Sequence, residues 1–412
     1  MKALLCLSLI LFFSLPHIFA QNTSPQPDTA QTPKDRSFRR IDILPAISYA
    51  PETNLTLGVI GVYYMDLYRK HPETKRSNIQ FLAVYTLANQ LSIRADWEIF
   101  TDGNVWRFRG RSFFDIYPDR NYGRGNQAGS LVAEFDEDGQ VDTLNFLNYT
   151  SNRFNLAPVF LRKIAPSWYV GIQGDLEYQF HSRTFPDTWL FANADSNRII
   201  DLPVEGLRSG LGFYTLFDTR DFVLNPLKGF FLEFGTLHFG PWLGSDFTFH
   251  SIRLDARKYI NTFQNQTLAL RGVANFRFTP NDNGIPIRAL SRVGGRDFIR
   301  GYFLGTYQDN HLLAAEAEYR LPFWKESDTA PFWKIWKRLG MVVFGGVAQV
   351  APRPGDFRMD QFRTAVGAGL RVLFNRESRV TIRIDYALGL SANSNGPGRR
   401  QSGFYFYLAE AF

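Results

Sequence analysis

A stretch of mixed glycine, arginine and aromatic residues between positions 292 and 322 holds the most distinctive chemistry in this 412-residue sequence. Its central residues are Gly294, Gly295, Ile299, Arg300, Gly301 and Tyr302. Glycine permits close approach of the backbone, and tyrosine can anchor a loop by packing. If Arg300 is folded into a charged interior, its guanidinium needs a carboxylate partner, because an unpaired buried charge is costly. The pattern therefore predicts a loop that is held in place by an ion pair.

Residues that could support catalysis are not arranged for it along the sequence. The histidines after position 20 all stand more than five residues apart, so they form no local metal pair and no base beside a nucleophile. The glycine-rich run 123–129 misses the nucleotide-binding spacing by one residue. The acidic run 136–139 lacks the further acids of a calcium loop, and its Asp-Gly pair indicates a hairpin turn. We therefore expect no enzyme, no cofactor and no metal site.

The segments that must position the loop show a period of two. Apolar residues alternate with polar or charged residues from Leu91 to Ile99, from Trp168 to Phe180 and from Val380 to Leu390. Because successive side chains of a strand point to opposite faces, each segment has one apolar face and one charged face. An antiparallel sandwich would show the same alternation.

Three properties favour a membrane barrel over a sandwich. The segments run for roughly ten to fifteen residues, which suits a tilted membrane strand better than a sandwich strand. Their polar faces carry Arg, Asp and Glu together, as the wall of a water-filled lumen does. Aromatic residues crowd the segment ends, as they do in interfacial girdles. The pattern indicates an all-β transmembrane barrel.

Sixteen such segments can be counted, and an even count is typical of bacterial outer-membrane barrels. They begin near residues 41, 55, 78, 91, 104, 152, 167, 207, 229, 246, 266, 311, 339, 363, 378 and 403. Long connections such as 117–151 and 280–310 fall on one side, and short ones such as 164–166 fall on the other, with 322–338 as an exception. The sequence thus predicts a sixteen-stranded antiparallel barrel over residues 41–412.

Composition narrows the class of protein further. The chain is 45% hydrophobic and 16% aromatic, which excludes a disordered chain. No run after residue 20 approaches the ~18 apolar residues of a membrane-spanning helix, which excludes a helical membrane protein. The net charge is +7, but basic residues are spread among acidic ones along the whole chain. No nucleic-acid partner is expected from that distribution.

The first forty residues have the composition of an export signal and a linker. Residues 1–20 combine Lys2 with a short apolar core and an Ile-Phe-Ala end that is typical of a cleavage site. Residues 21–40 are polar and rich in Pro, Ser and Thr, as a periplasmic linker is. The one cysteine, Cys6, lies in the signal, so the mature chain would carry no thiol. We expect a protein of the bacterial envelope.

Four motifs together resemble signatures of the BamA/TamA superfamily, the bacterial surface antigen proteins. Ile299-Arg300-Gly301-Tyr302, after Gly294-Gly295, is similar to the motif of a lumenal loop. The second motif consists of Tyr117, Pro118, Asp119, Tyr122, Gly123 and Gly125. The third lies at a periplasmic turn and consists of Asp218, Thr219, Arg220, Asp221, Asn225, Pro226 and Gly229. The fourth is Arg383 to Ala387 in the penultimate strand. The resemblance spans about residues 41–412.

The resemblance implies a barrel of sixteen strands with a lumenal loop between strands 11 and 12. In that family the loop arginine docks on acidic residues of the inner wall. Relatives usually carry an Asp in the thirteenth strand, where this chain has Phe344-Gly345-Gly346-Val347. Glu318 and Asp385 are therefore the expected wall partners of Arg300, because both lie on lumen-facing phases of their strands.

The resemblance also implies a function. The first and last strands would meet in a weak seam of the outer membrane of a Gram-negative bacterium, and the barrel would assist insertion, assembly or translocation of outer-membrane or secreted proteins. Relatives carry periplasmic POTRA domains, and the linker of about twenty residues is too short for one. Periplasmic or membrane accessory proteins would then supply client capture, and outer-membrane lipids would surround the wall. The alternative is a passive pore or structural barrel without insertase activity.

The last expected strand runs from Gly403 to Phe412. Its residues Phe404, Phe406, Leu408 and Phe412 would share one face and resemble the C-terminal signal that barrel-assembly machinery reads. Glu410 interrupts that face where an apolar residue is usual.

Overall fold

The computed structural model describes residues 39–65, 67, 71, 74–126, 132–135, 141–144, 147–184, 191–193, 198–200, 205–223, 225–263, 265–280, 284–296, 298–324, 334–375, 379–391, 400–408 and 410–412. All of them belong to one compact unit, Phe38–Phe412. The expected export signal, residues 1–20, lies outside the described residues, as does the expected linker, 21–40, apart from its last two residues. Those two residues begin the first strand.

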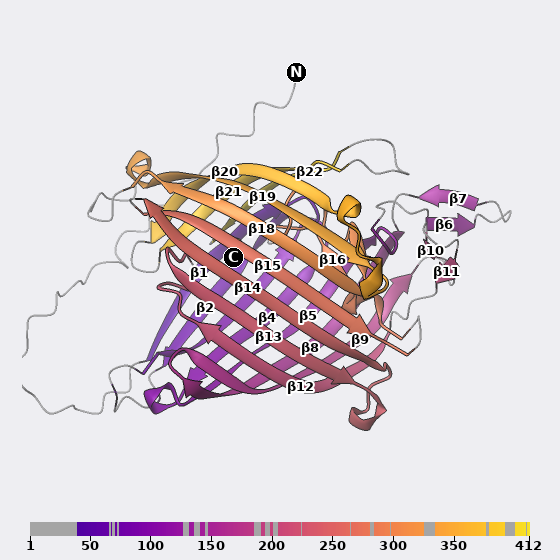
Figure 1. Cartoon of the computed structure of the whole chain (residues 1–412), viewed down its shortest axis with the longest axis horizontal. Coiled ribbons are helices and arrows are strands. Elements are labelled where there is room, and N and C mark those ends of the chain that lie inside the picture. Colours follow the sequence, from indigo (N-terminus) through magenta and orange to yellow (C-terminus); the bar gives the residue numbers. More distant parts are fainter. Residues whose placement is uncertain are drawn as a thin grey trace, which may run out of the picture. The chain divides into compact units, whose positions relative to one another are not determined.

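Within the described residues, sixteen strands form a closed antiparallel barrel (Figure 1). They are β1 (Arg39–Ala50), β2 (Asn54–Met65), β3 (Ser77–Thr86), β4 (Leu91–Phe100), β5 (Trp106–Asn121), β8 (Leu147–Ala165), β9 (Trp168–Thr184), β12 (Gly206–Asp218), β13 (Gly229–Phe239), β14 (Phe249–Phe263), β15 (Gln266–Phe278), β18 (His311–Pro322), β19 (Leu339–Ala351), β20 (Arg363–Asn375), β21 (Val380–Gly389) and β22 (Ser402–Leu408). Each strand pairs with the next along the chain, and β22 returns to β1. The predicted fold class and strand count are confirmed.

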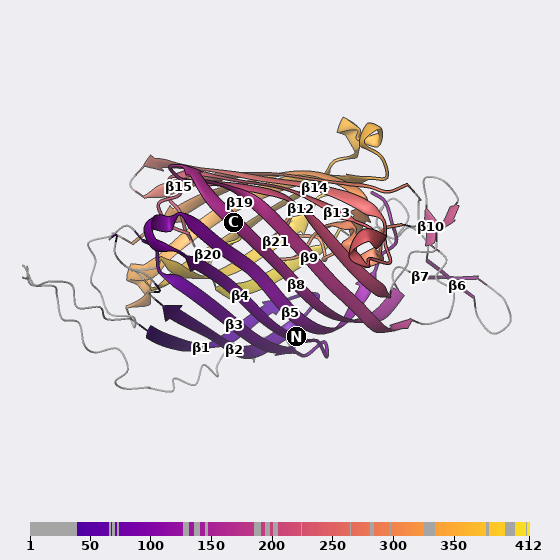
Figure 2. The ribbon, with the colours of Figure 1, turned by 90° about the horizontal axis from the view of Figure 1, so that it is seen from below.

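The side chains alternate across the wall as the sequence predicts. In β1 the side chains of Ile41 and Ile43 are 62% and 67% exposed on the outer face, whereas Ala46 and Ser48 are buried. In β21 the order is the same, with Asp385 buried and Tyr386 exposed. An apolar outer face with a polar inner face is the arrangement that a barrel needs in a bilayer. Figure 2 shows the strands running obliquely across this wall.

The long connections carry short elements of their own. A four-stranded sheet has the order β11 (Arg198–Ile200), β10 (Phe191–Asn193), β6 (Val132–Phe135) and β7 (Val141–Leu144). The acidic run 136–139, predicted to be a hairpin turn, lies outside the described residues. A second sheet pairs β16 (Ser291–Val293) with β17 (Tyr307–Asp309), inside the connection from β15 to β18.

The helices of the described residues are single turns of 3-10 helix. They are Asp102–Asn104, Pro241–Leu243, Ile287–Ala289, Ile335–Arg338, Pro354–Asp356 and Met359–Gln361. None of the helices in the described part of the chain is long and apolar enough to cross a bilayer.

The end of the chain departs from the prediction. β22 ends at Leu408, so the prediction that this strand continues to Phe412 is wrong. Phe404 is exposed on the outer face and Phe406 is half-buried, but Phe412 is buried, and the side chain of Leu408 lies outside the described residues. In a continued strand Glu410 would share the lipid-facing side with Phe404, which is unfavourable for a carboxylate. Instead Glu410 is buried and accepts a hydrogen bond from Arg371 at 2.8 Å.

A charge on the outer wall tests whether that wall faces hydrocarbon. Val343 lies near the middle of β19 with an exposed side chain. Val343→Arg should lower the free energy of unfolding by about 2–4 kcal/mol, measured by urea unfolding in lipid vesicles. Val343→Leu, the matched apolar variant, should change it little. Equal stability of the two variants would contradict a lipid-facing wall.

Candidate functional site

The connection between β15 and β18 folds so that its middle is buried. β16 and β17 pair with each other at its two ends, and Ile299, Arg300 and Tyr302 between them are almost completely buried. Gly301 has a φ of 111°, and a Cβ at this position would lie 2.8 Å from the carbonyl carbon of Leu388 in β21. Glycine is therefore required at 301 for the loop to lie against the wall.

The other motif residues fix the shape of the loop. The backbone N–H of Gly295 donates to the carbonyl oxygen of Tyr302 at 2.9 Å. Gly294 has a φ of 104°, and a Cβ there would lie 2.2 Å from the carbonyl oxygen of Phe303. The Tyr302 hydroxyl donates to the carbonyl oxygen of Thr364 in β20 at 2.7 Å. The loop is thus closed on itself and tied to a wall strand.

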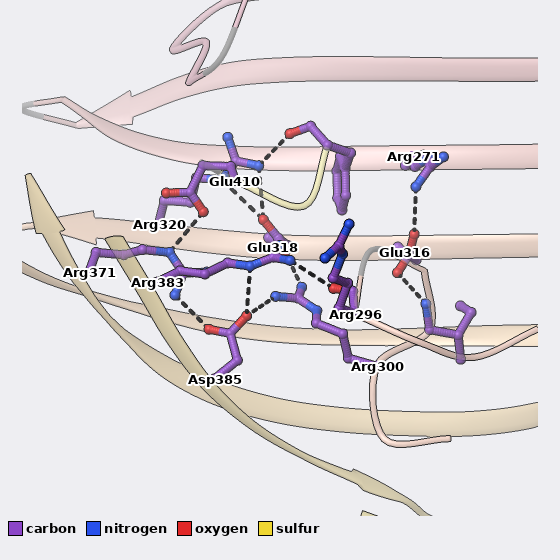
Figure 3. A network of polar contacts seen from close by, with 12 residues as sticks. Arg271, Arg296, Arg300, Glu316, Glu318, Arg320, Arg371, Arg383, Asp385 and Glu410 are labelled. Atoms are coloured by element: carbon purple, nitrogen blue, oxygen red, sulfur yellow. Dashed lines mark hydrogen bonds and ion pairs between the residues drawn. The ribbon is translucent and has the colours of Figure 1, made fainter. Parts of the chain in front are cut away.

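Arg300 contacts both carboxylates that the sequence suggested. Its Nη2 pairs with Glu318 of β18, and its Nη1 pairs with Asp385 of β21 (Figure 3). The three side chains are at most 1% exposed. Because an unpaired charge at such a depth is strongly unfavourable, these contacts fix where the loop can lie.

Phe344 of β19 lies beneath the same guanidinium. The centre of its ring is 3.5 Å from the Arg300 Cζ, which is a cation–π contact. An aromatic face thus contacts Arg300 from the strand in which relatives usually carry an Asp, and the two carboxylates come from β18 and β21, as expected.

Further arginines join the two carboxylates into a network. We name it the lumenal ion cluster; its members are Arg300, Arg320, Arg371, Arg383, Glu318, Asp385 and Glu410 (Figure 3). Arg371 donates to Asp385 at 2.6 Å, and Arg320 donates to Glu318 at 2.9 Å. Each of these carboxylates therefore lies between Arg300 and a second arginine of the wall. Arg383 lies 3.9 Å from Asp385 and donates to the carbonyl oxygen of Arg296 in the loop.

A second set of contacts holds the outer part of the same loop. Arg288 and Arg292 both donate to Asp119 of the motif at 117–125, the latter at 3.0 Å. Arg124 donates to Asp309 at 2.6 Å, and Gly125 forms a bridge with Gln308. The structure therefore places the motif at 117–125 against the outer part of the lumenal loop, on both sides of the motif at 294–302.

The motif at the turn between β12 and β13 borders this site across a cavity, which Asn225 lines together with Arg371 and Glu410. Arg220 donates to Asp218 at 2.9 Å, and one carboxylate oxygen of Asp221 accepts the backbone N–H of Leu227 at 3.0 Å. Pro226 is buried, and Gly229 has a φ of 120° beside the carbonyl oxygen of Thr219. These contacts shape the turn itself.

The seam between the first and last strands is short. β1 pairs with β2 along its whole length, from Arg39 to Ala50. Against β22, the described residues of β1 form a single registered pair, Tyr49 with Phe406. The ring of Tyr49 also lies 6.3 Å from that of Phe404. Most of the edge of β1 therefore has no strand beside it in the described part of the chain.

Comparison with known proteins agrees with this architecture. The Omp85 superfamily domain matches residues 74–412, which is most of the chain. The chain belongs to the Omp85 superfamily.

Solved structures with a related fold include BamA from Haemophilus ducreyi lacking POTRA domains 1–3, with 12% identity and a TM-score of 0.58 over 91% of this chain and 71% of that one. CdiB from Acinetobacter baumannii has 13% identity and a TM-score of 0.51, covering 91% of this chain and 66% of its own. At such low identity the likeness concerns the fold alone. No curated protein matches the sequence.

Several residues of this Omp85 barrel were not singled out as part of the site by their sequence. Arg320 and Arg371 were not distinguished from other lumen-facing arginines, although both contact the carboxylates that hold Arg300. The strand phase places them inside, but only the register shows which carboxylate each one meets. Glu410 was noted only as an interruption of an apolar face, and it proves to be a partner of Arg371.

The barrel also pairs two histidines that are distant in sequence. His238 of β13 and His250 of β14 are registered opposite each other, with their Nδ1 atoms 2.8 Å apart. They share a hydrogen bond in which one ring donates. Among the described residues no group of three or more His, Cys, Asp or Glu could hold a metal ion.

The role of Arg300 can be tested by loop opening. In Arg300→Ala the carboxylates keep Arg320 and Arg371, so we expect undocking of the loop to become easier by about 3 kcal/mol, roughly a hundredfold. Hydrogen exchange of the amides of Ile299 and Gly301 would report it, while the barrel stays folded. The matched control is Arg358→Ala, which removes an exposed ion pair with Asp360. Unchanged protection of the loop in Arg300→Ala would refute its anchoring role.

Proposed function

We propose that this protein assists the insertion or assembly of outer-membrane proteins, or the translocation of secreted ones, in the outer membrane of a Gram-negative bacterium. Membership of the Omp85 superfamily and the closed barrel with an apolar outer face support this proposal. The motifs at 117–125, 218–229, 294–302 and 383–387 support it as well, because together they resemble those of the BamA/TamA superfamily.

The observation that carries the proposal is the short seam. A strand edge without a partner presents a row of backbone N–H and C=O groups that another strand can pair with. In β1 this edge extends below Tyr49, and its outward side chains Ile41, Ile43 and Ile47 are apolar and exposed. A client strand that alternates apolar and polar residues could pair there and keep its apolar face in the lipid.

The lumenal loop is held in a fixed position on the wall, in contrast to this edge of β1. With Arg300 held between Glu318 and Asp385, the loop stays fixed to β18 and β21 on the C-terminal side of the barrel. Opening at the seam then leaves most of the wall unchanged. The chain acts by changing conformation and performs no covalent chemistry, and accessory proteins in the periplasm or membrane deliver the client.

The second candidate function is a passive pore or structural barrel. It is favoured by charged side chains on the lumen-facing phase of the wall, away from the loop. Arg111 and Arg253 are 53% and 56% exposed there, as they would be along an aqueous path. Bilayer conductance without any effect on other membrane proteins would be its signature.

Locking the seam separates the two functions. Tyr49→Cys with Phe406→Cys places a disulfide across the registered pair that the described residues form at the seam. Ile47→Cys with Leu57→Cys, registered between β1 and β2, is the matched control in a wall that stays closed. In cells that carry only the seam-locked variant, the outer-membrane proteome should lose other barrel proteins or a secreted client, and reductant should restore them.

The control pair should leave the proteome unchanged. Loss of many barrel proteins would indicate a general assembly role, and loss of one protein would indicate a dedicated transporter. A proteome that stays normal with the seam locked would overturn the proposal in favour of the pore.

A further inference from the structure

A cavity of about 270 Å³ lies at the end of the barrel where β18 ends and β19 begins. Its described lining also includes the turn between β12 and β13, the start of β15 and the end of β20. In the orientation of the proposed function, this end of the barrel faces the periplasm. Small-molecule sites usually have volumes of ~300–1,000 Å³, so this cavity suits a small ligand or a single side chain.

Two buried arginines of the lining each keep one nitrogen without an acceptor. Arg320 donates to Glu318 through Nε and Nη2, and its Nη1 is buried without a hydrogen-bond partner in the described part of the chain. Arg371 donates to Glu410 through Nε and to Asp385 through Nη1, and its Nη2 is likewise buried and unpartnered. The two arginine side chains are only 6% and 3% exposed.

Thr267 of β15 adds a third donor to the same cavity. Its hydroxyl is buried and has no hydrogen-bond partner among the described residues. Glu410 also lines the cavity (Figure 3), but its two oxygens already accept from Arg371 and from Thr381. Because a buried donor without an acceptor is unfavourable, three such donors around one cavity indicate a site for an acceptor.

The charge of the lining selects an anion. The described lining residues include Arg320, Arg371 and Arg379, against the single carboxylate of Glu410. Arg379 lies 3.8 Å from Asp221, so its charge is partly balanced already. A guanidinium is always protonated and can only donate, and its strongest hydrogen bonds are made to carboxylates and phosphates.

The rest of the lining is apolar and favours a carboxylate over a free phosphate. Phe222, Leu227 and Leu373 contribute to it, together with Trp324. The Trp324 ring covers Gly340, where a Cβ would lie 2.8 Å from a ring carbon. A bare phosphate has no apolar part to bury, whereas a carboxylate on a hydrocarbon group can place its oxygens at the arginines and its body against these side chains.

We propose that this cavity binds a carboxylate that is carried on an apolar group. One oxygen of the ligand accepts from Arg320 Nη1 and the other from Arg371 Nη2, and the Thr267 hydroxyl is a further donor. The carboxylate belongs either to a free small acid or to an acidic residue beside an apolar one in a periplasmic polypeptide. This binding goes beyond the proposed function and does not depend on it, because it involves neither the seam nor a client.

Calorimetric titration of the purified, folded barrel in lipid nanodiscs tests the site, with empty nanodiscs as the blank. The probes are phenylpropionate, its neutral amide phenylpropionamide, inorganic phosphate and the dipeptide acetyl-glutamyl-phenylalanine amide. Phenylpropionate should bind at least about tenfold more tightly than phenylpropionamide, because only the carboxylate forms charge-assisted hydrogen bonds. It should also bind more tightly than phosphate, which lacks an apolar body.

Two variants locate the bound probe. Arg371→Lys keeps the positive charge but removes the Nη2 donor, and should weaken phenylpropionate binding by about tenfold. Thr267→Val keeps the shape of the side chain and should weaken it by about fivefold. The matched controls are Arg358→Lys, at an exposed arginine, and Thr53→Val, in the turn between β1 and β2, and both should bind as the parent does.

The site would be overturned if phenylpropionate failed to bind, or bound no more tightly than its amide or phosphate. Undiminished binding in both Arg371→Lys and Thr267→Val would overturn it too, since the probe would then lie elsewhere. Binding of phenylpropionate without the dipeptide supports a free acid as the ligand, and tighter binding of the dipeptide supports a polypeptide. Failure of the proposed function would appear separately, as a normal membrane proteome with the seam locked.

Discussion

A buried arginine that must be neutralised is the constraint on which the rest of this structure depends. Arg300 lies inside the barrel, where an unpaired charge would be strongly unfavourable, so the loop is positioned wherever carboxylates meet its guanidinium. Glu318 and Asp385 come from strands that are not neighbours, and β19 and β20 lie between them. The ring of Phe344 on β19 fills the gap beneath the guanidinium. One side chain thus fixes the loop against much of the C-terminal half of the wall.

The same constraint extends to the residues that follow β22. The two carboxylates also bind Arg371 and Arg320, and these arginines hold Glu410 and the carbonyl oxygen of Phe412. A continuous chain of ion pairs and hydrogen bonds therefore connects the loop to Glu410 and Phe412, which follow β22.

The sequence predicted most of the wall because the physics of the wall is local. Period-two alternation depends only on neighbours in the chain, so the predicted starts of most strands lie close to the observed ones. The start of β8 differs most, because this strand begins at Leu147 where residue 152 was expected. Glu318 and Asp385 were chosen by strand phase, which the sequence also displays. Contacts that depend on register could not be found in this way. The stacking of Phe344, the pairing of His238 with His250 and the inward turn of Glu410 each require knowledge of which residues lie opposite one another.

The most direct test of the central claim is a double-mutant cycle between Arg300→Ala and Asp385→Asn. The quantity to measure is the free energy of loop opening, from hydrogen exchange of the amides of Ile299 and Gly301. If the ion pair of Arg300 with Asp385 helps to hold the loop, the two effects should be non-additive by at least about 1.5 kcal/mol. Effects that add to within about 0.5 kcal/mol would show that the loop is held by other contacts, and the account would then be wrong.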